Sequence, residues 1–384
     1  MKLGELCEIC SGGTPKRSVA EYWKDGTIPW VKIGDMSEKY VSSTEERITD
    51  AGFNNSSVKM LEPGTLLYSI FASIGAVSIL KIPASTNQAI AGLKIKDDSL
   101  DRDFLYHYLK SRESISKSSG RGAAQNNINL TILRNMQVTL PSIEIQRSIV
   151  RNLEMISNQV TIAESHLMDL DALVKSRFVE IFGDFACYET KPLIKCVDCI
   201  EAGKSPKCLA FSRKMAEPGV LKLSAISSGV YCENENKALP RSVSLTIDKV
   251  VHANDILLSR KNTPELVGRS VLVKHTDGNI MFPDIIFRMH PLPPINAMYL
   301  SYLLAGPLLH SIQSLAHGSA KSMSNIPKSE LAKLSIPIPA LNLQNEFANF
   351  VSQVDKSRFG GMLHLLNSLS GIMHASFFSV ADTD

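Results

Sequence analysis

Two pairs of cysteines have the spacing at which thiolates bind metal ions. Cys7 and Cys10 form one CxxC pair, and Cys196 and Cys199 form the other. Four thiolates brought together would hold a structural zinc ion. The two pairs lie in opposite halves of the sequence, however, and each sits on a short apolar stretch. We therefore favour the alternative that they are small buried residues, and we predict no metal site.

The cysteines as a set do not indicate a disulfide framework. The chain has seven of them, an odd number, and its first residues lack the apolar run of a secretion signal. The longest apolar stretch, near residues 69–80, is shorter than the roughly 20 residues of a membrane-spanning helix. We therefore expect the protein in the cytosol.

Motifs that would support catalysis are present only in fragments. Gly203-Lys204-Ser205 resembles the end of a phosphate-binding loop, but Asp198 stands where the loop needs its first glycine. Gly120-Arg121-Gly122 lacks a third glycine and a preceding strand. The sequence also lacks the Asn-Pro-Pro-aromatic signature of adenine methyltransferases, HExxH and Gly-x-Ser-x-Gly. We predict no catalytic residue and no cofactor; only a cysteine–histidine pair, which sequence spacing does not reveal, stays open.

Composition places the chain among ordinary globular proteins. Its 384 residues exceed the usual length of one domain, and 44% of them are hydrophobic and 21% charged. The net charge of +3 permits nucleic-acid binding without requiring it. We expect two or three domains.

The two halves of the sequence repeat one another. The turn Gly12-Gly13-Thr14-Pro15-Lys16 resembles Gly203-Lys204-Ser205-Pro206-Lys207. Further residues correspond in order: Gly120 with Gly318, Asn127 with Asn325, Pro141 with Pro339, and Gln146 with Gln344. A repeat of this length is too long for a solenoid, so it indicates a duplicated domain followed by its own tail.

Each tail has the pattern of a long helix, at 141–184 and 339–384. Apolar residues alternate at spacings of three and four, as in the seam of a coiled coil. The first seam is Ile149, Leu153, Ile156, Val160, Leu167, Leu170 and Val174. The second seam, which Arg358 and Gly361 interrupt, is Phe347, Val351, Val354, Leu365 and Ile372. The best partner for the first helix is its duplicate; the alternative is two helices packed in their own domains.

The body of each repeat, 1–140 and 185–338, has the pattern of a mixed α/β domain. Short apolar runs separated by proline, glycine, serine and asparagine predict strands. In the first repeat the predicted strands are 3–9, 28–34, 64–71, 75–81 and 89–95, followed by a helix near 102–116.

The loops of both repeats carry side chains suited to DNA. Arginine and lysine bind guanine or phosphate, and asparagine and glutamine suit adenine. Each such residue is individually more often a solvated surface residue. The candidates in the first repeat are Lys16, Arg17, Tyr22, Trp23, Lys32, Asn87, Gln88, Arg121, Asn126 and Asn127. Those in the second are Lys204, Lys207, Arg213, Arg260, Lys261, Asn262, Arg269, Lys321 and Ser322.

The first half carries an ordered series of short motifs. They are Ser11-Gly12-Gly13-Thr14-Pro15-Lys16, Tyr22-Trp23, Ile28-Pro29-Trp30-Val31-Lys32-Ile33-Gly34-Asp35-Met36, Ser73-Ile74-Gly75, Thr86-Asn87-Gln88 and, after the helix, Phe182-Gly183-Asp184. With the repeat and the heptads, this series resembles the specificity subunits of type I restriction-modification enzymes. The second half departs from the pattern: it has Phe282-Pro283-Asp284 in place of Thr-Asn-Gln and no Tyr-Trp pair.

The resemblance implies two α/β target-recognition domains separated by two antiparallel coiled-coil helices, related by a pseudo-twofold axis. It implies a non-catalytic subunit that binds double-stranded DNA, each domain reading one half of a bipartite target. The implied partners are methyltransferase subunits, two in number, and restriction subunits that translocate and cleave DNA. The residues alone leave two alternatives, a self-contained DNA-modifying enzyme and a duplicated scaffold that binds protein only.

Overall fold

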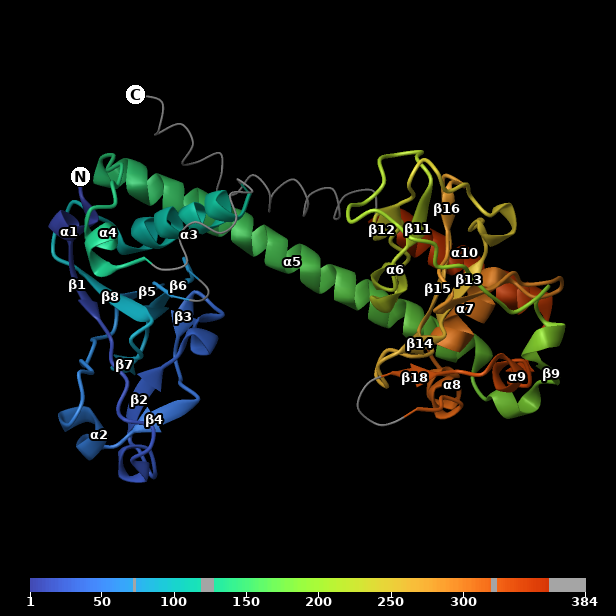
Figure 1. Cartoon of the computed structure of the whole chain (residues 1–384), viewed down its shortest axis with the longest axis horizontal. Coiled ribbons are helices and arrows are strands. Elements are labelled where there is room, and N and C mark those ends of the chain that lie inside the picture. Colours follow the sequence, from blue (N-terminus) through green and yellow to red (C-terminus); the bar gives the residue numbers. More distant parts are fainter. Residues whose placement is uncertain (72–73, 119–127, 319–322, 359–384) are drawn as a thin grey trace. The chain divides into compact units, whose positions relative to one another are not determined.

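The structure is a computed structural model that describes residues 1–71, 74–118, 128–318 and 323–358. These residues fall within two compact units, Met1–Leu167 and Met168–Phe359 (Figure 1). The boundary lies inside one continuous helix, α5, and not in a loop. Each unit is described by itself.

The first unit is built around a five-stranded sheet. Its strands, in spatial order, are β1 (Cys7–Ser11), β8 (Ile90–Ile95), β5 (Leu66–Ser69), β6 (Val77–Leu80) and β3 (Tyr40–Val41). All neighbours are antiparallel except β3, which runs parallel to β6. Every residue of β5 and β6 is buried. Three helices border this sheet: α1 (Leu3–Leu6), α3 (Arg102–Ser118) and α4 (Leu130–Arg134).

A second, smaller sheet of this unit is hydrogen-bonded to the glycine turn of residues 12–16. It consists of β4 (Glu46–Ile48), β2 (Ile28–Val31) and β7 (Ser85–Thr86), with α2 (Asp50–Asn54) and the 3-10 turns Ala20–Tyr22 and Ile33–Met36 beside it. Trp30, Ile48 and Val58 form its own small core. This subdomain therefore has a packed base on which a loop can be held rigidly.

The second unit repeats the plan with a four-stranded main sheet. In spatial order it holds β10 (Glu201–Ala202), β17 (Ile286–Met289), β13 (Ile256–Ser259) and β15 (Ser270–Leu272). A smaller sheet consists of β12 (Asn236–Ala238), β11 (Gly219–Leu221) and β16 (Ile280–Met281). Two further strand pairs are β14 (Lys261–Asn262) with β18 (Ser324–Asn325), and β19 (Ser335–Pro337) with β9 (Thr190–Pro192).

Short helices complete the second unit. They are the 3-10 turns Phe185–Cys187, Leu193–Lys195 and Ile247–Lys249, and the helices α6 (Ser224–Ser227), α7 (Ala297–Ala305), α8 (Leu309–Ser314), α9 (Lys328–Leu331) and α10 (Leu341–Ser357). The apolar helix α7 contributes Tyr299, Leu300 and Leu303 to the main core.

The helix α5 runs over Ile143–Phe182, 40 residues, inside the predicted range 141–184. Its first turns pack Val150 and Leu153 into the core of the first unit, with Ile149 against the same core. Its last turns pack Val174, Phe178 and Phe182 into the core of the second unit. The other seam residues, Ile156, Val160, Leu167 and Leu170, are half-buried.

The helix α10 packs antiparallel to the last turns of α5 within the second unit. Arg177 of α5 pairs with Glu346 at 2.7 Å, whereas Asp171, earlier in α5, pairs with Arg358, later in the chain. The Phe347 ring lies 5.1 Å from that of Phe178. Phe347, Val351 and Val354 are buried in this seam, whereas Leu365 and Ile372 lie outside the described residues.

The predicted fold class, mixed α/β with a long helix, is confirmed. One expected strand needs a correction. The run 3–9 begins as a helical turn, α1, because Glu5 accepts a hydrogen bond from the Lys2 backbone, and the strand β1 follows from Cys7. In the four described ranges no helix is both long and apolar enough to cross a membrane.

Candidate nucleic-acid interface

A glycine turn of the first unit is clasped by a segment far away in the sequence. The Gly12 backbone N–H donates to the Ile90 carbonyl at 3.1 Å, and that of Gly13 donates to the Thr86 carbonyl at 2.9 Å. The Thr14 hydroxyl donates to Oε1 of Gln88. A Cβ at position 12 would lie 2.2 Å from the Asn87 carbonyl oxygen, so this approach requires glycine.

The second unit builds the same turn from its own residues. Gly203 donates to the Ile286 carbonyl at 3.4 Å, and Lys204 donates to the Phe282 carbonyl at 3.0 Å. The Ser205 hydroxyl donates to the carboxylate of Asp284. The Phe-Pro-Asp segment, which departs from Thr-Asn-Gln in sequence, therefore occupies the same structural position. We name these two sites, residues 12–17 with 86–90 and residues 203–208 with 282–286, the first and second clasped turns.

The first clasped turn holds an arginine against two indole rings. The Arg17 Cζ atom lies 3.7 Å from the centroid of the Trp23 ring and 4.8 Å from that of Trp30. Its Nη1 donates to Oε2 of Glu46 at 2.5 Å. Trp30 Nε1 donates to the Gly13 carbonyl at 3.0 Å, which ties the stack to the turn itself.

Lys32 forms ion pairs with two carboxylates of its own unit. Its ammonium group lies 2.8 Å from Glu45 and 2.9 Å from Glu46. Hydrogen bonds to Glu45 and Glu46 raise the pKa of Lys32. Burial alone would raise the pKa of Glu46, but the hydrogen bonds from Arg17 and Lys32 outweigh it and lower that pKa. Lys32 thus supports the turn electrostatically.

The other first-unit candidates divide by exposure. Lys16 and Gln88 are exposed beside the clasp, whereas Tyr22 and Asn87 are half-buried. The Asn87 side chain accepts a hydrogen bond from the Ala89 backbone, so it shapes its own segment. The candidates Arg121, Asn126 and Asn127 lie outside the described residues.

In the second unit, Lys204 and Lys207 are exposed on the clasped turn. Arg213 is instead internal: its side chain is 5% exposed and lies 2.5 Å from Glu233 and 2.9 Å from Asp277. This arginine joins two loops and offers little surface to a ligand.

Three of the remaining second-unit candidates, Arg260, Lys261 and Asn262, lie on or next to β14. Arg260 lies over the Phe287 ring at 5.2 Å, and Lys261 and Asn262 pair with β18. Arg269 donates to the Ser227 carbonyl at 3.2 Å. Within the described chain, Nε of Arg260 and Nδ2 of Asn262 are buried without a hydrogen-bond partner. The candidates Lys321 and Ser322 lie outside the described residues.

Sequence reasoning missed Glu46, the carboxylate shared by Arg17 and Lys32. No spacing rule reaches it, because the antiparallel pairing of β4 with β2 places Glu46 opposite Trp30. The sequence showed that Asp284 replaces Gln88 in the second repeat. It did not show that the Thr14 hydroxyl binds Gln88 and the Ser205 hydroxyl binds Asp284.

Only the first cysteine of each CxxC pair lies on a fully buried position, so the prediction of buried residues holds for half of them. Cys7 and Cys196 are buried, and Cys10 and Cys199 are half-buried. Burial raises the pKa of the Cys7 thiol to about 12. The described side chains include no group of three histidine, cysteine or acidic residues placed to hold a metal ion.

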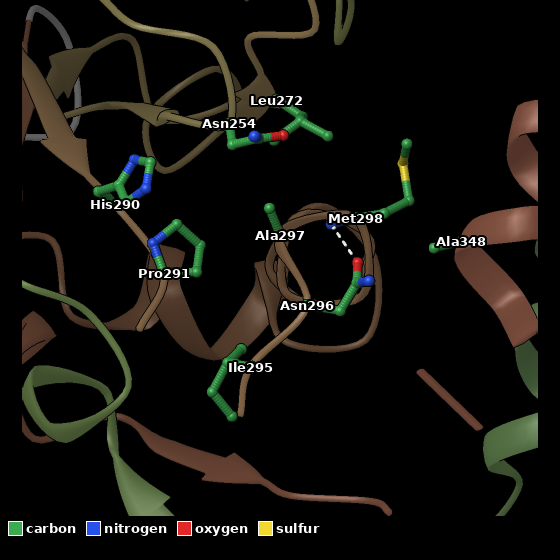
Figure 2. Close-up of a pocket in the computed structure, with 9 residues that line it drawn as sticks. All are labelled: Asn254, Leu272, His290, Pro291, Ile295, Asn296, Ala297, Met298 and Ala348. Carbon is green, nitrogen blue, oxygen red and sulfur yellow. Dashed lines mark hydrogen bonds between the residues drawn. The ribbon is translucent and has the colours of Figure 1, made fainter. Parts of the chain in front are cut away.

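A cavity of about 430 Å³ lies elsewhere in the second unit, and Figure 2 shows its lining. It is bordered by the amino end of α7, where the Asn296 side chain accepts a hydrogen bond from the Met298 backbone at 2.9 Å. His290, also in the lining, contacts the buried Asp255 at 3.0 Å. None of the predicted DNA-binding residues that the structure describes lines this cavity.

Comparisons with known proteins agree with the sequence pattern. Residues 1–169 match a family described as the type I restriction modification DNA specificity domain. A curated relative is the type I restriction enzyme MjaIX specificity subunit of Methanocaldococcus jannaschii, 27% identical over 199 residues. That match covers 50% of this chain and 45% of the relative, so the aligned part of this chain spans less than half of the relative's length.

Two solved structures share the fold over essentially the whole chain. One is an S subunit of a type I restriction-modification system from M. genitalium, with a TM-score of 0.51, 14% identity and coverage of 100% of this chain and 96% of the other. The second comes from work on assembly and conformational transition of a type I restriction-modification system, with a TM-score of 0.60, 16% identity and coverage of 100% and 97%.

Proposed function

We propose that this chain is a DNA-recognition subunit without catalysis of its own, because residues 1–169 match the type I restriction modification DNA specificity domain and a curated relative is a specificity subunit. Its first reader, residues 1–140, would contact one half of a bipartite target. Its second reader, residues 185–338, would contact the other half.

One observation carries this proposal: the clasped turn is built twice with different surface chemistry. The hydrogen bonds of Gly12 and Gly13 are repeated by Gly203 and Lys204. Both copies present a lysine at the equivalent position, Lys16 and Lys207; around it the first copy presents Arg17 and Gln88, whereas the second presents Lys204. A conserved frame with exchanged exposed side chains is what two readers of unlike sequences require, because base edges are distinguished by the donors and acceptors that meet them.

The helix α5 supports a spacing role. Forty helical residues at 1.5 Å each extend about 60 Å, and the two ends are packed into different cores. A rigid helix between two readers would fix the number of unspecified base pairs between the half-sites, as dimer geometry sets half-site spacing in repressors.

The partners in this proposal supply the chemistry. Two methyltransferase subunits would bind the chain and methylate adenine, and restriction subunits would translocate and cleave the DNA. The chain's own part is to choose the sequence, and its place of action is the cytosol. The small net charge of +3 fits a reader that binds DNA firmly only within the assembly.

The experiment is to express the chain with candidate modification and restriction subunits in a host free of adenine methylation, and then to sequence the methylome. We expect methylated adenines within one bipartite motif whose two halves are separated by a fixed gap. A complex that assembles yet methylates no defined motif, and selects none from a random-oligonucleotide pool, would contradict the proposal.

A further inference from the structure

We propose that Arg17 reads a guanine in the half-site of the first reader, and that Trp23 and Glu46 hold it ready to do so. This inference rests on the proposed function and adds the base and the residue. The neighbouring Lys16, exposed and unstacked, has the chemistry of a phosphate contact.

The stack fixes the plane of the guanidinium. Arg17 lies 3.7 Å above Trp23, and Trp23 packs edge-on against Trp30 with ring centroids 5.0 Å apart. Trp30 is buried, and Trp23 Nε1 donates to the Lys16 carbonyl at 3.3 Å. The plane of the arginine is therefore set by a core residue and by the turn, so little rotamer entropy is lost on binding.

The ion pair fixes the direction of the fork. Nη1 donates to Glu46 at 2.5 Å, and in the part of the chain that the structure describes this is the only hydrogen bond of the guanidinium. A guanidinium has five N–H donors, and the Arg17 side chain stays 52% exposed. Donors remain to face a ligand.

Glu46 does not pair with Arg17 alone. Glu46 is shared with Lys32, which also binds Glu45, so two cations and two carboxylates form one network. The network acts as a scaffold that holds Arg17 in place, while the exposed edge of the guanidinium remains cationic.

A planar, held fork fits guanine better than phosphate. Guanine presents the O6 and N7 acceptors side by side in the major groove, and a bidentate arginine is the commonest specific contact to them. Phosphate can also accept a bidentate arginine, but a flexible lysine binds phosphate as a point charge without any fixed geometry. Stacking and a buttressing carboxylate would serve no purpose for charge alone.

The second reader lacks this device. The residue after Lys207 is Cys208, whose thiol contacts the Pro206 carbonyl, and no Tyr-Trp pair follows in its sequence. The guanine contact should therefore be confined to one half-site.

The test compares methylation motifs of complexes carrying Arg17→Lys, Arg17→Gln and Glu46→Gln, with Lys16→Ala as the matched control. Arg17→Lys keeps the charge and removes the fork, so it separates base reading from phosphate binding. We expect the complex to lose its preference for guanine at one position of the first half-site. The discrimination against other bases there should fall by about 5- to 150-fold, the range for one bidentate contact. Glu46→Gln should relax the same position less, and the second half-site should stay unchanged.

Lys16→Ala should weaken binding to all sequences about equally and reduce its salt dependence. An Arg17→Lys complex with the same methylation motif as the wild type would overturn the inference. So would an Arg17→Lys complex that binds all DNA sequences more weakly by the same factor, with no relaxed position. Both results presuppose that the wild-type complex reads a bipartite motif. A wild-type complex without such a motif would instead refute the proposed function, so the two failures are distinguishable.

Discussion

Gln146 and Gln344 hold equivalent positions at the starts of α5 and α10 and share two equivalent hydrogen bonds. Each is fully buried. Nε2 of Gln146 donates to the Pro141 carbonyl, and Nε2 of Gln344 donates to the Pro339 carbonyl, both at 2.8 Å. Oε1 of each accepts a backbone N–H at 2.8 Å, from Asp101 and Asn296. These bonds join the start of α5 to the residue before α3, and the start of α10 to the residue before α7. We call this arrangement the lock.

This lock predicts a large loss of stability on Gln146→Leu. The substitution leaves the Asp101 N–H and the Ser99 and Pro141 carbonyls without their partner. Each buried group left unpaired costs about 1–3 kcal/mol, so we expect at least about 2 kcal/mol in chemical denaturation. The control is Gln159→Leu on the exposed face of α5; equal stability of the two variants would contradict the lock.

Lys39 should anchor the first unit to α5. Its ammonium group lies 2.8 Å from both Asp103 and Glu154. We expect Lys39→Met to cost about 1–3 kcal/mol, between the values of exposed and buried pairs. Thermal melting measures the loss. Lys24→Met, at an exposed lysine of the same unit, is the control and should leave the melting temperature within a degree or two.

The same cluster predicts a pH dependence. Burial would raise the pKa of Asp103, but the hydrogen bond and charge of Lys39 outweigh it, and the pKa falls below its ordinary 3.8. A lowered native pKa means that the stabilisation is complete above pH 3.8 and is lost as pH falls through the native value. Denaturation curves from pH 6 down to pH 2 should show this loss in the wild type and a smaller one in Lys39→Met. Parallel profiles would argue against it.

Arg213 should matter for stability and not for base choice. Because its guanidinium is nearly buried between Glu233 and Asp277, Arg213→Met leaves two carboxylates without the cation that they share. We expect about 3–5 kcal/mol of destabilisation, and no change of motif at a temperature where the variant remains folded. The adjacent, exposed Lys214→Met should leave stability unchanged. A relaxed base position in Arg213→Met would favour direct contact with DNA.

Helix length should set the gap in the target. Deleting residues 157–163 from α5, with seven residues of the C-terminal helix, shortens the spacer by about 10 Å. At 3.4 Å per base pair, the motif should lose about three unspecified base pairs or recognition should fail. Substituting exposed residues of that heptad, without deletion, should keep the original gap. An unchanged gap after deletion would refute the spacing role.

The sequence predicted the repeated plan and the long helix well, because both depend on periodic apolar patterns. The expected runs 64–71, 75–81 and 89–95 contain β5, β6 and β8, and the expected helix 102–116 lies within α3. Leu153 and Val174 are buried as the heptad pattern required.

The sequence could not separate exposed cations from structural ones. Arg17 and Arg213 look alike in a list of loop arginines, yet one is half-exposed on an indole and the other is enclosed by two carboxylates. The difference arises from strand pairing and loop packing between residues far apart in the chain. Exposure of a cation is a tertiary property, and no local pattern encodes it.

The boundary between the two units inside α5 has a genetic consequence. A crossover between related genes within the codons of this helix would join one intact reader to another, provided that the heptad register is kept. The hybrid chain would retain both buried ends of the helix, Leu153 on one side and Phe178 on the other. Recombination would therefore create a new target preference in a single step, without an intermediate sequence that fails to fold.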